Sequence, residues 1–209
     1  MIKKLTPVFL FLIACGGVQR ENSLPILGNT IYEGNDTIYH TIQDFSLLDQ
    51  DSTLVTNSTM SDKVYIADFF FTSCPTICPT MKAQMLRVYE KYEGNNQVGI
   101  LSHTNDPVYD TIPLLKDYSS RLGVSSSQWK FLWGDQDIIY DLAERSYMSI
   151  ADEDNAAPGG FIHSGAFLLV DKKRRIRGVY DGTDANQVDV LMNDIGKLLE
   201  ESNSEANVN

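Results

Sequence analysis

The chain has 209 residues, of which 43% are hydrophobic and 22% are charged. This composition excludes a disordered or fibrous protein and is sufficient for one domain with a substantial core. The 28 acidic residues outnumber the 17 lysines and arginines, and the resulting net charge of -11 argues against a nucleic-acid-binding surface.

The N-terminal segment has the features of a bacterial secretion signal. Two lysines precede an apolar run from Val8 to Ala14, which is too short to cross a bilayer as a helix. The run ends in Leu12-Ile13-Ala14-Cys15, which resembles the lipobox of bacterial lipoproteins. We therefore expect a signal peptide over residues 1–14, a lipid on Cys15 and a tether over residues 15–41. The domain would then face the extracytoplasmic side of a bacterial membrane.

Residues 42–200 alternate predicted strands and helices. The segment from Phe45 to Val55 suits a β-hairpin with a polar turn, and the apolar run from Val64 to Phe71 is typical of a central strand covered on both faces. Met81 to Tyr92 shows apolar residues at helical spacing. Further strands are predicted at 98–102, 129–133, 166–171 and 176–180, and further helices at 112–122, 136–145 and 187–199.

This order of elements indicates the fold class. Strands that alternate with helices and close with a hairpin and a helix favour an α/β fold, in which helices flank a central mixed sheet. With its N-terminal β-hairpin, the arrangement is similar to the thioredoxin fold. Residues 201–209 have almost no apolar content and are predicted to be a disordered tail.

Two of the three cysteines stand where the central strand leads into a helix, in Thr72-Ser73-Cys74-Pro75-Thr76-Ile77-Cys78-Pro79. A helix N-terminus favours thiolate over thiol, so both cysteines should be good ligands and nucleophiles. The three-residue spacer lets the two sulfurs approach each other. The pair therefore indicates a redox site, two ligands of a soft-metal site, or a disulfide staple, although so short a closed loop would stabilise little.

A third metal ligand would have to come from elsewhere in the chain. His163 follows a glycine-rich loop and precedes the predicted strand 166–171, so it can fold over the dithiol. His103 is a weaker candidate at the same sheet edge, and Met148 is weaker still because a methionine at the end of a helix usually belongs to the core. His40 is expected to be solvated.

The cysteine segment, His163-Ser164 and Phe167-Leu168-Leu169-Val170-Asp171 together resemble the Sco/SenC family. These are thioredoxin-fold copper proteins that serve cytochrome c oxidase assembly. The resemblance extends over roughly residues 45–199, and its four-residue cysteine spacing differs from the three-residue spacing of thioredoxins. It implies that Cys74, Cys78 and His163 bind copper.

The donor set agrees with that implication. Two thiolates and one imidazole suit Cu(I), whereas Zn(II) would require a fourth ligand to complete its tetrahedron. The resulting prediction is a membrane-tethered copper chaperone. Its partners would be the copper-bearing subunit of cytochrome c oxidase and a thiol reductase or copper donor.

Two alternative functions remain open from the sequence. A thiol-disulfide reductase would use Cys74 and Cys78 as its redox pair on the cysteines of the oxidase or of other extracytoplasmic proteins, so enzymatic activity is undecided. A peroxidase would use Thr72 and Cys74 but lacks an evident arginine near them.

The sequence departs from the family pattern next to the histidine. An acidic residue commonly precedes the family's histidine, whereas Ile162 does so here. Asp68, on the predicted central strand, is the candidate for the missing carboxylate near the site.

Overall fold

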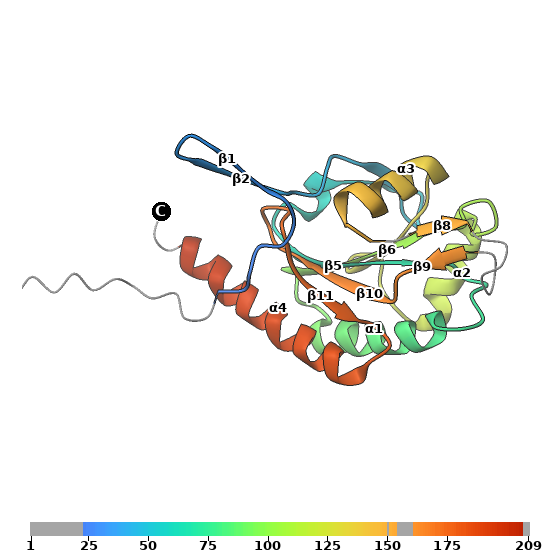
Figure 1. Cartoon of the computed structure of the whole chain (residues 1–209). Helices are drawn as coiled ribbons and strands as arrows, with labels where there is room; N and C mark the ends of the chain where they lie inside the picture. The colour runs from blue at the N-terminus through green and yellow to red at the C-terminus, as the bar shows by residue number, and fades with distance from the viewer. Residues whose placement is uncertain (1–22, 150, 154–160, 207–209) are drawn as a thin grey trace, which may run out of the picture.

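The computed structural model in Figure 1 describes residues 23–149, 151–153 and 161–206. Its centre is a five-stranded sheet in the order β11-β10-β5-β6-β7. Its strands are β5 (Val64–Phe70), β6 (Val98–Thr104), β7 (Trp129–Leu132), β10 (Ala166–Val170) and β11 (Ile176–Asp181). β5, β6 and β7 run parallel, and β10 runs antiparallel to β5 and β11. The expected mixed sheet is therefore confirmed.

Helices and short hairpins surround this sheet. α1 and α4 lie on one side of the sheet and α3 on the other (Figure 1). The helices are α1 (Cys78–Tyr92), α2 (Ile112–Leu122), α3 (Gln136–Asp141) and α4 (Ala185–Ala206). The strand pairs outside the main sheet are β1 (Thr30–Glu33) with β2 (Asp36–Tyr39), β3 (Ser46–Leu48) with β4 (Leu54–Thr56), and β8 (Ala151–Glu153) with β9 (Phe161–His163).

The alternation of side chains along β5 divides the core into two layers. Ile66 and Phe70 pack on the layer that contains α1, whereas Tyr65 and Phe69 pack on the opposite layer. All seven residues of β5 are buried, as expected for a central strand whose two faces are both covered. The predicted hairpin at 45–55 and the predicted helix at 112–122, which ends at a left-handed Gly123, are confirmed.

The segment predicted to be a tether is not extended throughout. β1 and β2 form a hairpin within residues 15–41, with Ile31 opposite Ile38 and with Gly34 in the left-handed conformation at the turn. The β-prone tyrosines and isoleucines on either side of this glycine are the signal that the prediction overlooked. His40, expected to be solvated, is half-buried and donates a hydrogen bond of 2.6 Å from Nε2 to the Ser146 carbonyl oxygen.

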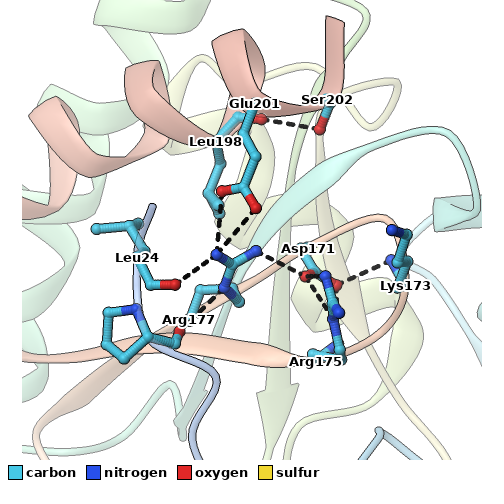
Figure 2. Close-up of polar contacts among 9 residues, drawn as sticks. Leu24, Asp171, Lys173, Arg175, Arg177, Leu198, Glu201 and Ser202 are labelled. Atoms are coloured by element: carbon cyan, nitrogen blue, oxygen red, sulfur yellow. Dashed lines mark hydrogen bonds and ion pairs between the residues drawn. The ribbon is translucent and has the colours of Figure 1, made fainter. Parts of the chain in front are cut away.

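The predicted disordered tail begins too early. α4 continues to Ala206, and near its end Glu201 accepts hydrogen bonds from the buried guanidinium of Arg177, at 3.0 and 3.2 Å. Figure 2 shows the same guanidinium bound to the Leu24 carbonyl oxygen and to Asp171. One arginine on β11 therefore joins the start of the described chain to its last helix, which no periodicity in residues 201–206 could reveal.

Residues 136–145 also differ in detail from the prediction. The α-helix ends at Asp141, and a wider π-helical turn follows over Leu142–Ser146. Among the helices of the described residues, none combines the length and the apolar content that a membrane span requires. The predicted signal peptide and Cys15 lie outside the described residues.

Candidate metal centre

The dithiol lies at the carboxyl edge of the central sheet. Cys74 sits in the loop after β5, where its backbone N–H donates to the Phe71 carbonyl oxygen at 3.3 Å, and Cys78 is the first residue of α1. Both side chains are buried and carry thiols. Pro79 occupies the first turn of α1, where a missing backbone N–H leaves no helical bond unmade. The predicted position of both cysteines is therefore confirmed.

The loop that carries Cys74 is fixed by a buried carboxylate. Asp110 accepts hydrogen bonds from the Thr72 backbone N–H at 3.0 Å, from the Thr72 hydroxyl, and from the Thr104 hydroxyl at 2.6 Å. Burial raises the pKa of Asp110, and the three donor groups oppose that shift. Asp110 therefore connects the loops that follow β5 and β6.

The two thiols have different acidities. Burial opposes ionisation of Cys74, but hydrogen bonds from the Thr76 and Cys78 backbones and from the Cys78 thiol together lower its pKa. Burial raises the pKa of Cys78 to about 12, and the hydrogen bond with Cys74 contributes to the increase. Cys74 is therefore the group that ionises first, and the expectation of lowered pKa values holds for Cys74 only.

β10, the strand that begins three residues after His163, brings this part of the chain to the same edge of the sheet. β10 runs antiparallel to β5, so the residues before Ala166 lie beyond the end of β5, where the cysteine loop begins. Two residues after His163, a Cβ placed on Gly165 would lie 3.7 Å from the Cδ1 atom of Ile77, the neighbour of Cys78. The backbone of His163 pairs with Ala151 in the β8–β9 hairpin, and its side chain lies outside what the structure describes.

A buried ion pair lies on the α1 side of the central sheet. The Lys82 ammonium, one turn after Cys78 on α1, lies 2.5 Å from the Asp68 carboxylate and 3.2 Å from the Ser102 hydroxyl. It also lies 4.1 Å from the centroid of the Phe70 ring. The Asp68 carboxylate is thus bound to Lys82 and Ser102, which limits its availability as the carboxylate that the sequence lacks beside His163.

His103 lies on the opposite face of the sheet from the dithiol. Its ring stacks on Phe69 with the centroids 4.9 Å apart and approaches Tyr147 at 5.3 Å. Burial lowers the pKa of His103 to about 4, so its imidazole is neutral. The structure therefore does not bring His103 to the dithiol. Met148 is exposed rather than part of the core, and its backbone is left-handed with φ of 51°.

Sequence reasoning missed two residues that organise the site. Asp110 had an available signal, because Asp106-Pro107 and Asp110-Thr111 follow the strand next to the cysteine strand. The signal for Lys82 was weaker: it lies on the buried stripe of a predicted helix, where a lysine requires a buried counter-charge. Both act through packing partners that are distant in the sequence.

The donors fit a soft metal ion. Within the described side chains no group of three or more histidine, cysteine and acidic residues is placed to hold a metal, and this set does not include the side chain of His163. Two thiols of unequal acidity, with the segment that follows His163 close to Ile77 between them, match the preference of Cu(I) for few and soft ligands.

Comparison with known proteins agrees with this architecture. The family model described as SCO1/SenC matches residues 34–200. The SCO1 protein homolog of Bacillus subtilis is 31% identical over 199 residues, which cover 93% of this chain and 95% of that protein.

Two solved structures extend the comparison. A SCO1/SenC family lipoprotein from Bacillus anthracis superposes with a TM-score of 0.70 at 26% identity, covering 77% of this chain and 95% of that one. BsSco, described as having a disulfide switch and as a member of the Sco family of cytochrome c oxidase assembly proteins, gives a TM-score of 0.67 at 29% identity, covering 76% and 93%. The chain belongs to the SCO1/SenC family.

Proposed function

We propose that this protein carries one Cu(I) ion as cargo, bound by Cys74, Cys78 and His163, and that it serves the assembly of cytochrome c oxidase. The observation that carries the proposal is the meeting of two chain segments at one sheet edge. Cys78 begins α1 and Cys74 lies in the loop before it, and the segment that follows His163 approaches Ile77 between them.

The acidities of the thiols suggest how the ion is bound. Cys74, whose pKa is lowered by hydrogen bonds from the Thr76 and Cys78 backbones and the Cys78 thiol against the opposing effect of burial, supplies the first thiolate. Cys78 keeps its proton in the metal-free protein because its pKa is about 12, so binding of the ion must displace that proton to solvent. His163 would add a neutral imidazole. Three ligands leave the ion open to an incoming thiolate, so the cargo can pass to a partner without becoming free.

The partner is inferred from family membership. BsSco belongs to a family of cytochrome c oxidase assembly proteins, and we assign the same role to this chain, with the copper-bearing subunit of the oxidase as the receiving partner. A copper donor or a thiol reductase would be needed to load the protein or to keep its dithiol reduced.

Membrane attachment through Cys15 is part of this proposal. The relative from Bacillus anthracis is a lipoprotein, which supports the lipobox interpretation. Leu27 donates to the Ile176 carbonyl oxygen at 2.8 Å, near the amino end of β5, whereas Cys74 follows its carboxyl end. A tether before Leu27 would therefore leave the dithiol facing away from its anchor. Cys15→Ser should release the protein from membranes, and a variant that stays fully membrane-bound after cleavage would contradict the anchor.

A second candidate function is thiol-disulfide reduction of the oxidase cysteines. It is favoured by the unequal acidity of the two thiols, which suits a nucleophile and a resolving thiol, and by the disulfide switch of BsSco. The reductase does not require His163, whereas the copper carrier does. His163→Ala should therefore weaken copper binding and leave thiol exchange intact.

Metal analysis after anaerobic reduction tests the proposal. The wild type should retain one copper per chain through gel filtration, and the Cys74→Ser/Cys78→Ser variant should retain none. Tight stoichiometric copper in that double variant would overturn the dithiol site.

A further inference from the structure

An exposed apolar pair lies in a loop that is hydrogen-bonded to the dithiol loop. Val108 and Tyr109, in the loop between β6 and α2, are 82% and 58% exposed. This loop and the cysteine loop lie at the same end of the sheet (Figure 1), because β5 and β6 run parallel. Asp110 accepts hydrogen bonds from Thr72, so the apolar pair is joined to the segment that leads to Cys74.

Hydrogen bonds from Trp133 and Tyr140 fix the backbone of the loop that carries this pair. The Trp133 indole donates to the Pro107 carbonyl oxygen at 2.8 Å, and the Tyr140 hydroxyl donates to the Asn105 carbonyl oxygen at 2.9 Å. The Tyr109 backbone N–H donates to the Asp106 carboxylate at 3.1 Å. A preorganised loop loses little conformational freedom when a partner binds, so exposed apolar side chains on it are suited to recognition.

The segments nearest this pair in the fold are acidic. The segments 72–81, 105–115 and 133–143 contain five aspartates and no lysine or arginine. Asp135 and Asp137 are exposed, and none of the ion pairs among the described residues involves them or Asp106. We define the rim surface as Asp106, Val108, Tyr109, Asp135 and Asp137. Its charge is complementary to a cationic partner.

We propose that the rim surface docks the cysteine-bearing segment of the protein that exchanges copper or electrons with Cys74 and Cys78, and that lysines or arginines flank the cysteines of that segment. This inference rests on the proposed function. Any exchange partner must bring a donor atom within bonding distance of the sulfurs, and Asp110, next to Tyr109 of the rim surface, is hydrogen-bonded to Thr72 of the dithiol loop.

Thiol exchange with synthetic peptides tests the docking surface. The probes are a short peptide with a reduced Cys-x-x-x-Cys pair flanked by lysines and the same peptide flanked by glutamates. One peptide thiolate attacks the oxidised Cys74–Cys78 disulfide and forms a mixed disulfide. The second peptide thiolate then resolves it, so two electrons pass to the protein, the peptide becomes a disulfide, and Cys74 and Cys78 emerge as thiols.

The wild type should react on the order of 10-fold faster with the lysine peptide at low salt, and high salt should abolish the difference. Asp135→Asn/Asp137→Asn should reduce the preference, and the helix start should survive because asparagine caps a helix as well as aspartate does. Val108→Ser/Tyr109→Ser should slow both peptides about 10-fold. Dithiothreitol, which is small and neutral, should reduce all of these proteins at the same rate.

The β1–β2 hairpin supplies matched controls. Ile31→Ser/Tyr32→Ser removes an apolar pair that is 55% and 77% exposed, and Glu33→Gln/Asp36→Asn removes two charges; both should react as the wild type does. Equal rates for the two peptides, or full activity of Val108→Ser/Tyr109→Ser, would overturn the docking surface. Cu(I) binding measured on the same preparations distinguishes failure of the copper function from failure of the docking surface. Loss of copper binding with an intact peptide preference would contradict only the copper function.

Discussion

The Lys82 ammonium lies 2.5 Å from the Asp68 carboxylate, and both groups are buried between α1 and the central sheet. Ser102 completes the arrangement by donating to Asp68 and accepting from the Trp129 indole at 2.9 Å. Each of these buried charges is stable only with the other beside it. Without its partner, either one would be a desolvated ion with no compensating charge.

Removal of one partner should therefore be costly. Lys82→Met should lower the free energy of unfolding by about 3–5 kcal/mol, and Asp68→Asn/Lys82→Met should recover most of that loss. Urea unfolding monitored by circular dichroism measures both values. Arg87→Met is the control, because Arg87 forms an ion pair of the same length with Asp189 on the surface, where the expected loss is at most about 1 kcal/mol. A small loss for Lys82→Met would contradict the account of the buried pair.

The unequal thiols predict an order of alkylation in the reduced, metal-free protein. The thiolate is the reactive form, and the pKa of Cys74 is lowered whereas that of Cys78 is about 12. Iodoacetamide near pH 8 should therefore label Cys74 first, and the labelling rate of Cys78 should still rise with pH above 10. Peptide mapping by mass spectrometry reads out both sites. Preferential labelling of Cys78 would show that the acidities are reversed.

The same shift has a consequence for stability. The pKa of Cys78 is raised on folding, so its contribution to stability is fully present below the pKa of an unfolded thiol and is lost as the pH rises from about 9 to about 12. Cys78→Ser should remove this part of the alkaline dependence of the free energy of unfolding. Unfolding curves across that pH range for the wild type and for Cys78→Ser measure it, and identical pH profiles would contradict the raised pKa.

The contact between Arg177 and Glu201 predicts where α4 frays. Glu201→Gln should weaken the hold on the last turns of α4 and accelerate hydrogen exchange at the backbone amides of Ser202 to Ala206. Glu200→Gln is the matched control, because Glu200 is exposed on the same turn. Equal protection of these amides in both variants would show that Arg177 does not hold the end of α4.

Local patterns in the sequence were sufficient to predict most of the main sheet. The apolar run of β5 and the helical stripe of α2, closed by Gly123, depend only on neighbouring residues. The end of α4 could not be predicted in the same way, since the carboxylate of Glu201 finds its partner on β11. The β1–β2 hairpin had a local signal, since β-prone residues flank Gly34, but the polar composition of the surrounding segment led to the prediction of a tether.

In the candidate site, too, features set by neighbouring residues were predictable and features set by distant contacts were not. Cys74 and Cys78 lie near each other in the sequence and stand at a strand-to-helix junction, so their position was predictable. Side chains alternate between the two faces of a strand, so the face that His103 occupies depends on the register of β6 against β5. His103 pairs with Phe69, and its ring therefore lies on the face opposite α1. The bond between Asp110 and Thr72 joins two loops that follow different strands, and only the assembled sheet reveals it.

His163, and not His103, should be the third ligand of the copper cargo. Cu(I) titration of the reduced protein against a competing chelator, under anaerobic conditions, tests it most directly. His163→Ala should weaken the affinity at least about 10-fold, whereas His103→Phe, which keeps an aromatic ring stacked on Phe69 and removes an unpartnered buried nitrogen, should bind copper as the wild type does. An unchanged affinity in His163→Ala, or a loss confined to His103→Phe, would contradict the account.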